Sequence, residues 1–92
     1  MSLDSDRLET RLNEAFGGST GEARVVSRQA TDLAESGQYE TDTGIQLTAD
    51  IVLEELTDAP GGTPADRWNW WIGALEIAYG GYRVFGIRQY RR

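Results

Sequence analysis

The chain has 92 residues, which is the size of one small domain, and it contains neither cysteine nor histidine. Disulfide bonds, thiolate or imidazole metal ligands and thiol or imidazole catalysis are therefore excluded. Fifteen acidic residues oppose nine basic ones, all of them arginine, for a formal net charge of −6. Because a single core of this size is only marginally stabilising, we expect the chain to form a homo-oligomer, most simply a dimer.

The charged residues resemble those of proteins from salt-accumulating haloarchaea. Arginine without lysine is typical of a GC-rich genome, and an excess of carboxylates keeps a protein soluble in concentrated salt. The resemblance implies a halophilic archaeal source, and the alternative is an acidic protein from another GC-rich organism. The N-terminus lacks the basic and apolar pattern of a signal peptide, which predicts a cytoplasmic protein.

The first third of the chain predicts two amphipathic helices. Asp4 or Ser5 is a good cap for the first helix, and the glycines at 17 and 18 end it. Ser19–Glu22 has the pattern of a capping box and opens a second helix that ends near Gly37. The residues expected to face the core are Leu8, Leu12, Ala15 and Phe16 in the first helix, and Ala23, Val26, Ala30 and Leu33 in the second.

The middle of the chain is harder to interpret. Ser36–Gly44 is polar and aperiodic, which predicts a loop. Ile45–Leu53 alternates almost like a strand, yet Thr48 is a suitable cap for a helix with Leu47 packed against Val52. No hairpin turn flanks this segment, so a helix is favoured. The alternative is an α+β fold with strands near 45–53 and 82–90.

The strongest helix start is Thr63–Asp66, which follows a break at Asp58–Thr63 and combines a threonine cap with proline at the first helical position. We expect one helix from Pro64 to about Ile87. Because each residue of a helix turns by about 100°, the apolar residues of this segment fall on two faces, one of bulky residues and one mainly of small residues. The bulky face holds Trp68, Trp71, Ile72, Leu75, Ala78, Tyr79, Tyr82 and Phe85, and the small-residue face holds Trp70, Gly73, Ala74, Ile77, Gly80, Gly81 and Val84.

This wheel separates the three tryptophans of the stretch RWNWWIG. Trp68 and Trp71 are expected in the core, whereas Trp70 lies on the small-residue face. That face packs against another helix of the same chain, or against a partner chain, or the helix breaks at the glycines 80 and 81 and continues as a strand. A membrane span is not expected, because charged residues interrupt the apolar run.

The sequence predicts self-association through the C-terminal helix. Glu76 and Arg83 are placed symmetrically about residues 79 and 80, so two antiparallel helices crossing at Gly80 would bring Glu76 near Arg83 of the partner subunit. The residues predicted to form this interface are Trp70, Gly73, Glu76, Ile77, Gly80, Gly81, Arg83 and Val84.

The end of the chain carries a different charge from the rest. Residues 80–92 hold four arginines and no acid, and residues 88–92 form a short basic tail. Phosphate contact by Arg88, Arg91 and Arg92, with Tyr90 stacking on a base, is one hypothesis. The opposing interpretation is that arginines at a helix end stabilise its dipole and aid solubility without a nucleic acid.

No catalytic motif is present, and without cysteine, histidine and lysine most catalytic chemistry is excluded. The acidic clusters lack the pattern of a calcium loop, so no metal or other cofactor is expected. The sequence thus predicts a single all-α domain, residues 1–92, with about four helices and a long, mostly buried C-terminal helix. Its expected role is non-enzymatic interaction or regulation. A nucleic-acid-associated regulator and a binder of a small molecule between Trp, Tyr and Arg side chains are the alternatives.

Overall fold

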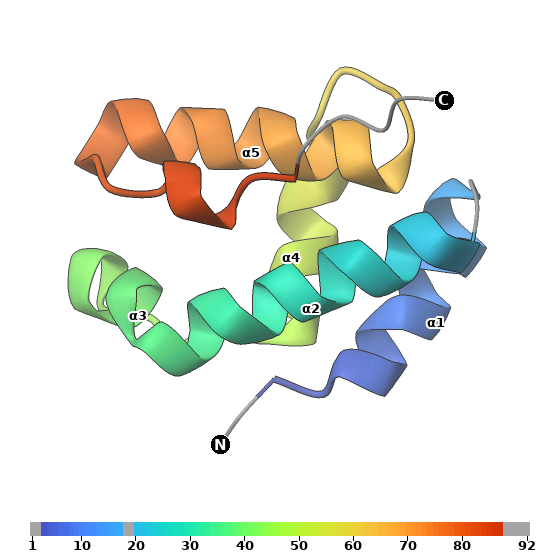
Figure 1. Cartoon of the computed structure of the whole chain (residues 1–92), viewed down its shortest axis with the longest axis horizontal. Coiled ribbons are helices and arrows are strands. Elements are labelled where there is room, and N and C mark those ends of the chain that lie inside the picture. The colour runs from blue at the N-terminus through green and yellow to red at the C-terminus, as the bar shows by residue number, and fades with distance from the viewer. Residues whose placement is uncertain (1–2, 18–19, 88–92) are drawn as a thin grey trace.

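The computed structural model describes residues 3–17 and 20–87, and every regular element in these ranges is a helix (Figure 1). The all-α prediction is confirmed, and the described residues of the segments 45–53 and 82–90 form no strand. The elements are α1 (Ser5–Phe16), α2 (Thr20–Ser36), α3 (Gln38–Thr43), α4 (Ala49–Thr57), α5 (Pro64–Tyr79) and a short 3-10 helix η1 (Arg83–Phe85).

Helices α1 and α2 form as their sequences predict. The Asp4 carboxylate caps α1 by accepting from the backbone N–H of Arg7 at 3.1 Å, and Gly17 ends it with a φ of 68°. Ser19, the first residue of the predicted capping box, lies outside the described residues. The predicted core positions that are buried without exposed surface are Leu8, Leu12, Ala23, Val26, Ala30 and Leu33. The expectation is wrong for Ala15, which is exposed, and Phe16 is half-buried.

The loop predicted for Ser36–Gly44 is wrong, because this segment contains helix α3. Glycines in the left-handed conformation flank the helix at 37 and 44. Tyr39 anchors it, since this side chain is buried and its ring centroid lies 5.8 Å from that of Trp71. Only one of the six residues of α3 is buried, so its sequence shows no repeat of apolar residues from which a helix could be predicted.

Helix α4 confirms the helical interpretation of the ambiguous middle segment. The Thr48 hydroxyl caps it by accepting from the backbone N–H of Ile51 at 3.2 Å. Leu47 and Val52 are both buried, as the predicted contact across the helix start requires. The helix begins only at Ala49, so residues 45–47 lie outside it.

The core lies between α5 and the other helices. Helix α2 contacts α1, α3, α5 and η1, while α4 connects α1 with α5 (Figure 1). Trp68, Trp71, Ile72 and Leu75 are buried, so α5 buries one face as expected. The prediction of a mostly buried C-terminal helix is wrong for the opposite face, which is exposed.

Helix α5 ends at Tyr79 and not near Ile87. Gly80 and Gly81 follow it, each with a φ of 82°, a conformation that side-chain-bearing residues rarely adopt. The chain then turns back toward α5, and residues 80–87 are called the return segment below. The chain does break at these glycines, as one of the three alternatives had it, but it continues as a 3-10 helix and not as a strand.

Candidate interaction face

The side chains of residues 68–71 lie on opposite sides of α5, some in the core and one at the surface. Trp68 has no exposed surface, and its indole Nε1 donates to the backbone oxygen of Phe85 at 2.8 Å. Trp71 is 4% exposed and packs edge-on against Trp68, with ring centroids 5.5 Å apart. The expectation that both residues belong to the core is confirmed.

Asn69 holds the return segment against α5. Its Nδ2 donates to the backbone oxygen of Ile87, and its Oδ1 accepts from the backbone N–H of the same residue, both at 2.8 Å. The side-chain amide thus pairs with the main chain as a neighbouring strand would. Sequence reasoning missed this role of Asn69, because nothing in the sequence shows that the chain turns back after the glycines.

Glu76 stabilises the turn that follows α5. Its Oε1 accepts from the backbone N–H of Tyr82 at 2.7 Å and of Arg83 at 3.1 Å. These backbone hydrogen bonds, led by that of Tyr82, hold the pKa of the Glu76 carboxyl below its ordinary value of 4.5. The predicted crossing at Gly80 is therefore wrong in its geometry, because Glu76 bonds within its own chain and Arg83 is not on the helix.

The opposite side of α5 carries an exposed apolar face. Trp70 is 43% exposed and Ile77 is 89% exposed, and Gly73 and Ala74 between them are also exposed. The spacing of these four residues is that of one helical stripe. We call the stripe formed by Trp70, Gly73, Ala74 and Ile77 the α5 outer face.

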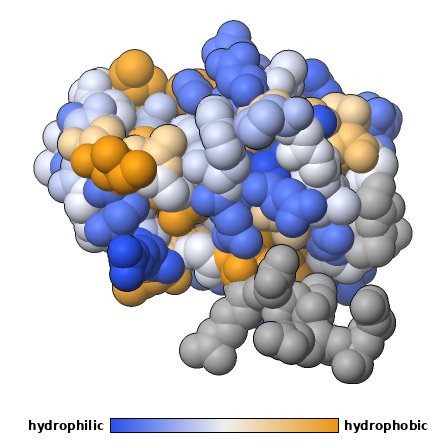
Figure 2. Space-filling view, turned by 90° about the horizontal axis from the view of Figure 1, so that it is seen from above, coloured by the Kyte–Doolittle hydropathy of each residue, from blue (hydrophilic) through white to orange (hydrophobic). Residues whose placement is uncertain are grey.

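The α5 outer face carries no charged side chain. Every exposed residue of α5 from position 70 to its end is uncharged, including Ala78 and Tyr79 beyond the stripe. Figure 2 looks onto the side of the molecule that α5 forms, and hydrophobic residues gather toward the end at which α5 finishes in Figure 1. In a chain with 26% charged residues, such a face is a candidate contact surface.

Gly73 has no role inside the chain that requires glycine. A Cβ atom built at this position would meet nothing within 4 Å, and the backbone is in an ordinary helical conformation. Glycine inside a helix lowers stability by about 1 kcal/mol relative to alanine. The contacts within the molecule therefore do not explain why a glycine stands there.

The other residues predicted for self-association are only partly on this face. Gly80 and Gly81 form the turn after α5, and Arg83 and Val84 lie exposed on η1. Val84 is 79% exposed, so it adds an apolar side chain near the C-terminal end of α5. The residues proposed to contact a nucleic acid, Arg88, Tyr90, Arg91 and Arg92, lie outside the described residues.

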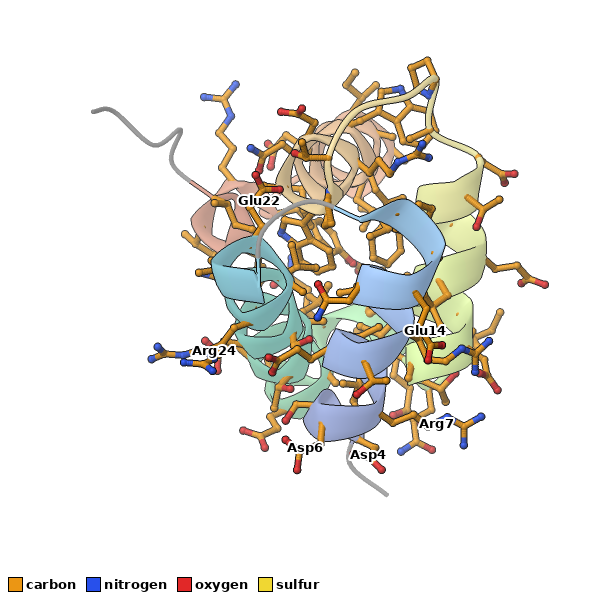
Figure 3. All side chains as sticks on the ribbon, turned by 90° about the vertical axis from the view of Figure 1, so that its right-hand side faces the viewer. Asp4, Asp6, Arg7, Glu14, Glu22 and Arg24 are labelled. Carbon is orange, nitrogen blue, oxygen red and sulfur yellow. The ribbon has the colours of Figure 1, made fainter. Side chains whose placement is uncertain are left out.

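The charged residues gather elsewhere, on α1, α2 and α4. Ion pairs join Arg7 to Asp50 at 3.7 Å, Arg11 to Asp50 at 4.0 Å and Arg24 to Glu9 at 3.8 Å, and of these side chains only that of Glu9 is partly buried. In Figure 3 the side chains of Asp6, Arg7 and Arg24 point outward from α1 and α2. Among the described residues no group of three acidic side chains is placed to hold a metal ion.

A cavity of about 190 Å³ opens between the first turns of α1 and α4. Its lining consists of Leu3, Asp4, Arg7, Thr48, Ala49 and Asp50. Pockets for small organic ligands are usually larger, roughly 300–1,000 Å³, and are rich in aromatic residues. This cavity does not have the aromatic lining that the small-molecule hypothesis requires.

Comparison with known proteins identifies one family. The model described as the WNWW domain matches residues 1–76, and the four letters of that description are the one-letter sequence of residues 68–71. The match covers α1 to α4 and most of α5, and it stops before the return segment. No curated protein and no solved structure matches the chain. No helix among the described residues is long and apolar enough to span a membrane.

Proposed function

The chain belongs to the WNWW domain family, and from this premise we propose that it is a small non-enzymatic interaction protein that forms homodimers through the α5 outer face. The observation that carries the proposal is the exposure of Trp70. Trp68, Asn69 and Trp71 are each used by the fold, two in the core and one in holding the return segment. Trp70 alone of these four residues is turned to the solvent.

The energy of covering Trp70 supports this role. A tryptophan side chain buries ~150–250 Å² when fully covered, so covering its exposed 43% contributes roughly 2 kcal/mol at ~25 cal/mol per Å². Ile77 adds to this gain, because most of its side chain is exposed on the same stripe. Tryptophan is also the residue type most enriched among those that dominate binding at protein interfaces.

A second copy of this chain is the partner that we propose. The domain is small and has no disulfide, so burying a second apolar surface adds stability that a single core lacks. The net charge of −6 opposes association in dilute buffer, and salt screens that repulsion over a distance of about 3 Å at 1 M. We propose that the protein works in the cytoplasm of a halophilic archaeon, where salt is present at such concentrations.

The experiment measures mass by light scattering over a range of protein and salt concentrations. We expect the natural chain to form dimers and Ile77→Glu to remain a folded monomer, because the new carboxylate would be buried in the contact. Ile45→Glu is the matched control, since Ile45 is 52% exposed and lies in the segment before α4. This control should dimerise like the natural chain. A natural chain that stays monomeric throughout, or an Ile77→Glu variant that still dimerises, would contradict the proposal.

A further inference from the structure

We propose that the side chains that hold the return segment form a peptide-binding site, and that a segment of another protein can bind there in its place. These side chains are Gln38 and Asp42 on α3 and Trp68 and Asn69 on α5, and together they are called the return-segment site. The chain's own residues occupy the site in the structure, so the return segment acts as an autoinhibitory contact. This binding does not use the α5 outer face and does not depend on the proposed dimer.

Hydrogen bonds to the main chain make the site suited to a peptide. Four hydrogen bonds of 2.8 Å join its side chains to main-chain atoms: Gln38 Nε2 donates to Gly81, Trp68 Nε1 donates to Phe85, and the Asn69 amide both donates to and accepts from Ile87. Any residue supplies a main-chain oxygen, and any residue except proline supplies the N–H. Main-chain hydrogen bonds of this kind provide affinity in peptide recognition, while side-chain contacts provide specificity.

Tyr82 provides the specificity. Within residues 80–87 it is the side chain without exposed surface, and its hydroxyl donates to Asp42 Oδ2 at 2.8 Å. Phe85 and Ile87 are half-buried and pack against the core, whereas the two residues between the tyrosine and the phenylalanine are exposed. The ligand that we propose is therefore a peptide segment with a tyrosine, an aromatic residue three positions later and an aliphatic residue five positions later.

The site and its occupant belong to different parts of the sequence. The match to the WNWW domain covers residues 1–76, which include all four side chains of the site, and the return segment begins after its end. Trp68 has no exposed surface, and the acceptor for its indole N–H is a carbonyl oxygen of the docked segment. An unpaired buried N–H costs free energy. The matched part of the chain therefore favours a docked segment, whichever chain supplies it.

The connection to α5 allows the return segment to leave the site. Gly80 and Gly81 each have a φ of 82°, and a Cβ atom on Gly80 would meet nothing within 4 Å. Glycine adopts many backbone conformations, so this connection can open without strain. The tether keeps the return segment at an effective concentration on the order of millimolar. A free peptide therefore binds weakly to the natural chain and more tightly once the tethered segment is weakened.

The experiment weakens the return segment without changing the site. Tyr82→Ala in the full chain removes the buried side chain and its bond to Asp42. The ligand is a synthetic peptide with the sequence of residues 80–87, acetylated and amidated so that its ends resemble a continuous main chain. Isothermal titration calorimetry should show one peptide bound per chain. We expect the peptide to bind roughly tenfold more tightly to Tyr82→Ala than to the natural chain, because the competing segment has lost its anchor.

Two changes test the contacts of the bound peptide. A peptide with alanine in place of its tyrosine should bind about tenfold more weakly. Asn69→Ala, added to Tyr82→Ala, should lower the affinity by about tenfold, because two hydrogen bonds are lost. Asn13→Ala in the same background is the matched control, since Asn13 is a half-buried asparagine on α1 outside the site, and it should leave the affinity unchanged.

The proposal also covers a Tyr82→Ala chain that does not fold alone. The peptide should then restore its circular dichroism, and Tyr82→Phe, which keeps the ring, should bind the peptide more tightly than the natural chain does. No peptide binding by either variant, equal binding of the two peptides, or an affinity that Asn69→Ala leaves unchanged would overturn the site. A natural chain that stays monomeric would contradict the proposed dimer and leave this site standing.

Discussion

Tyr82 is buried in the core, as expected, but it lies in the return segment and not on α5. Its hydroxyl donates to Asp42 Oδ2 at 2.8 Å, and burial first, then this bond and the negative charge of Asp42, raise the pKa of the phenol above its ordinary value of 10.0. The neutral phenol is thus favoured by folding. Its contribution to the free energy of unfolding is complete below pH 10 and is lost as pH rises above that value, where the unfolded chain ionises first.

Tyr82→Phe should therefore flatten the loss of stability at alkaline pH and should lower stability at neutral pH by about 1 kcal/mol through the lost hydrogen bond. Denaturant unfolding between pH 7 and 11 measures both effects. Tyr79→Phe is the control, because the Tyr79 side chain is 49% exposed. An alkaline profile that Tyr82→Phe leaves unchanged would rule out this residue as the cause.

Gly73 allows a second prediction at the same scale. Gly73→Ala should stabilise the monomer by about 1 kcal/mol, because alanine favours the helix and its methyl group meets no neighbour. The measurement is denaturant unfolding in the Ile77→Glu background, where the proposed dimer makes no contribution. A destabilised alanine variant would show that the site is more crowded than the structure indicates.

At the scale of single elements, the turn after α5 depends on one carboxylate. Backbone hydrogen bonds lower the pKa of Glu76, so the ionised form stabilises the folded chain. This stabilisation is present above pH 4.5 and is lost as pH falls through the lowered value. Glu76→Gln should loosen the return segment at neutral pH and remove that acid dependence.

Amide hydrogen exchange of Tyr82 and Arg83, followed from pH 7 to pH 3, measures the effect directly. Protection of these two amides should fall in Glu76→Gln, and Glu14→Gln on exposed α1 should leave it unchanged. Equal protection in both variants would show that the carboxylate is not what holds the turn.

The helix starts could be predicted from the sequence because their signals are local. Asp4, Thr48 and Thr63 each bond to an amide three residues ahead, and such caps need nothing from the rest of the chain. The short helix α3 could not be predicted, because one tyrosine anchors it to Trp71 on a distant helix. The same holds for the path of the return segment, which depends on bonds from residues 68 and 69 to residues 85 and 87.

The candidate site shows the same division. The helical wheel separated Trp70 from Trp68 and Trp71 correctly, since that depends only on the turn per residue. It could not show which face the other helices leave open. It also joined Glu76 and Arg83 to the interface, because the wheel continued past two glycines at which the real helix ends.

At the scale of the whole molecule, the net charge of −6 opposes folding, because the excess carboxylates repel one another. The ion pairs of Asp50 with Arg7 and Arg11 are exposed and contribute little, about 0–1 kcal/mol each. Burial first, and then the nearby Asp58 and Glu54, raise the pKa of Glu55, because three acidic residues lie close together at the end of α4. Salt screens such repulsion.

We therefore expect the thermal midpoint to rise from dilute buffer to molar potassium chloride. The double variant Glu54→Gln and Glu55→Gln should gain less from the same salt, because part of the repulsion is already removed. Thermal unfolding followed by circular dichroism compares the two chains. A midpoint independent of salt in the natural chain would contradict the proposed halophilic character.

The hydrogen bond from Trp68 to Phe85 also affects the order in which the protein folds during its synthesis. The N-terminal helices leave the exit tunnel first, and their apolar faces can begin to associate while the rest of the chain is still being made. The indole N–H of Trp68 receives its acceptor only when residue 85 has emerged, and the amide of Asn69 waits for residue 87. The matched family segment ends at Glu76, so it contains all three tryptophans but neither of the two residues whose backbone oxygens accept these bonds. Residues 85 and 87 are thus the ones that complete the hydrogen bonding of the tryptophan cluster.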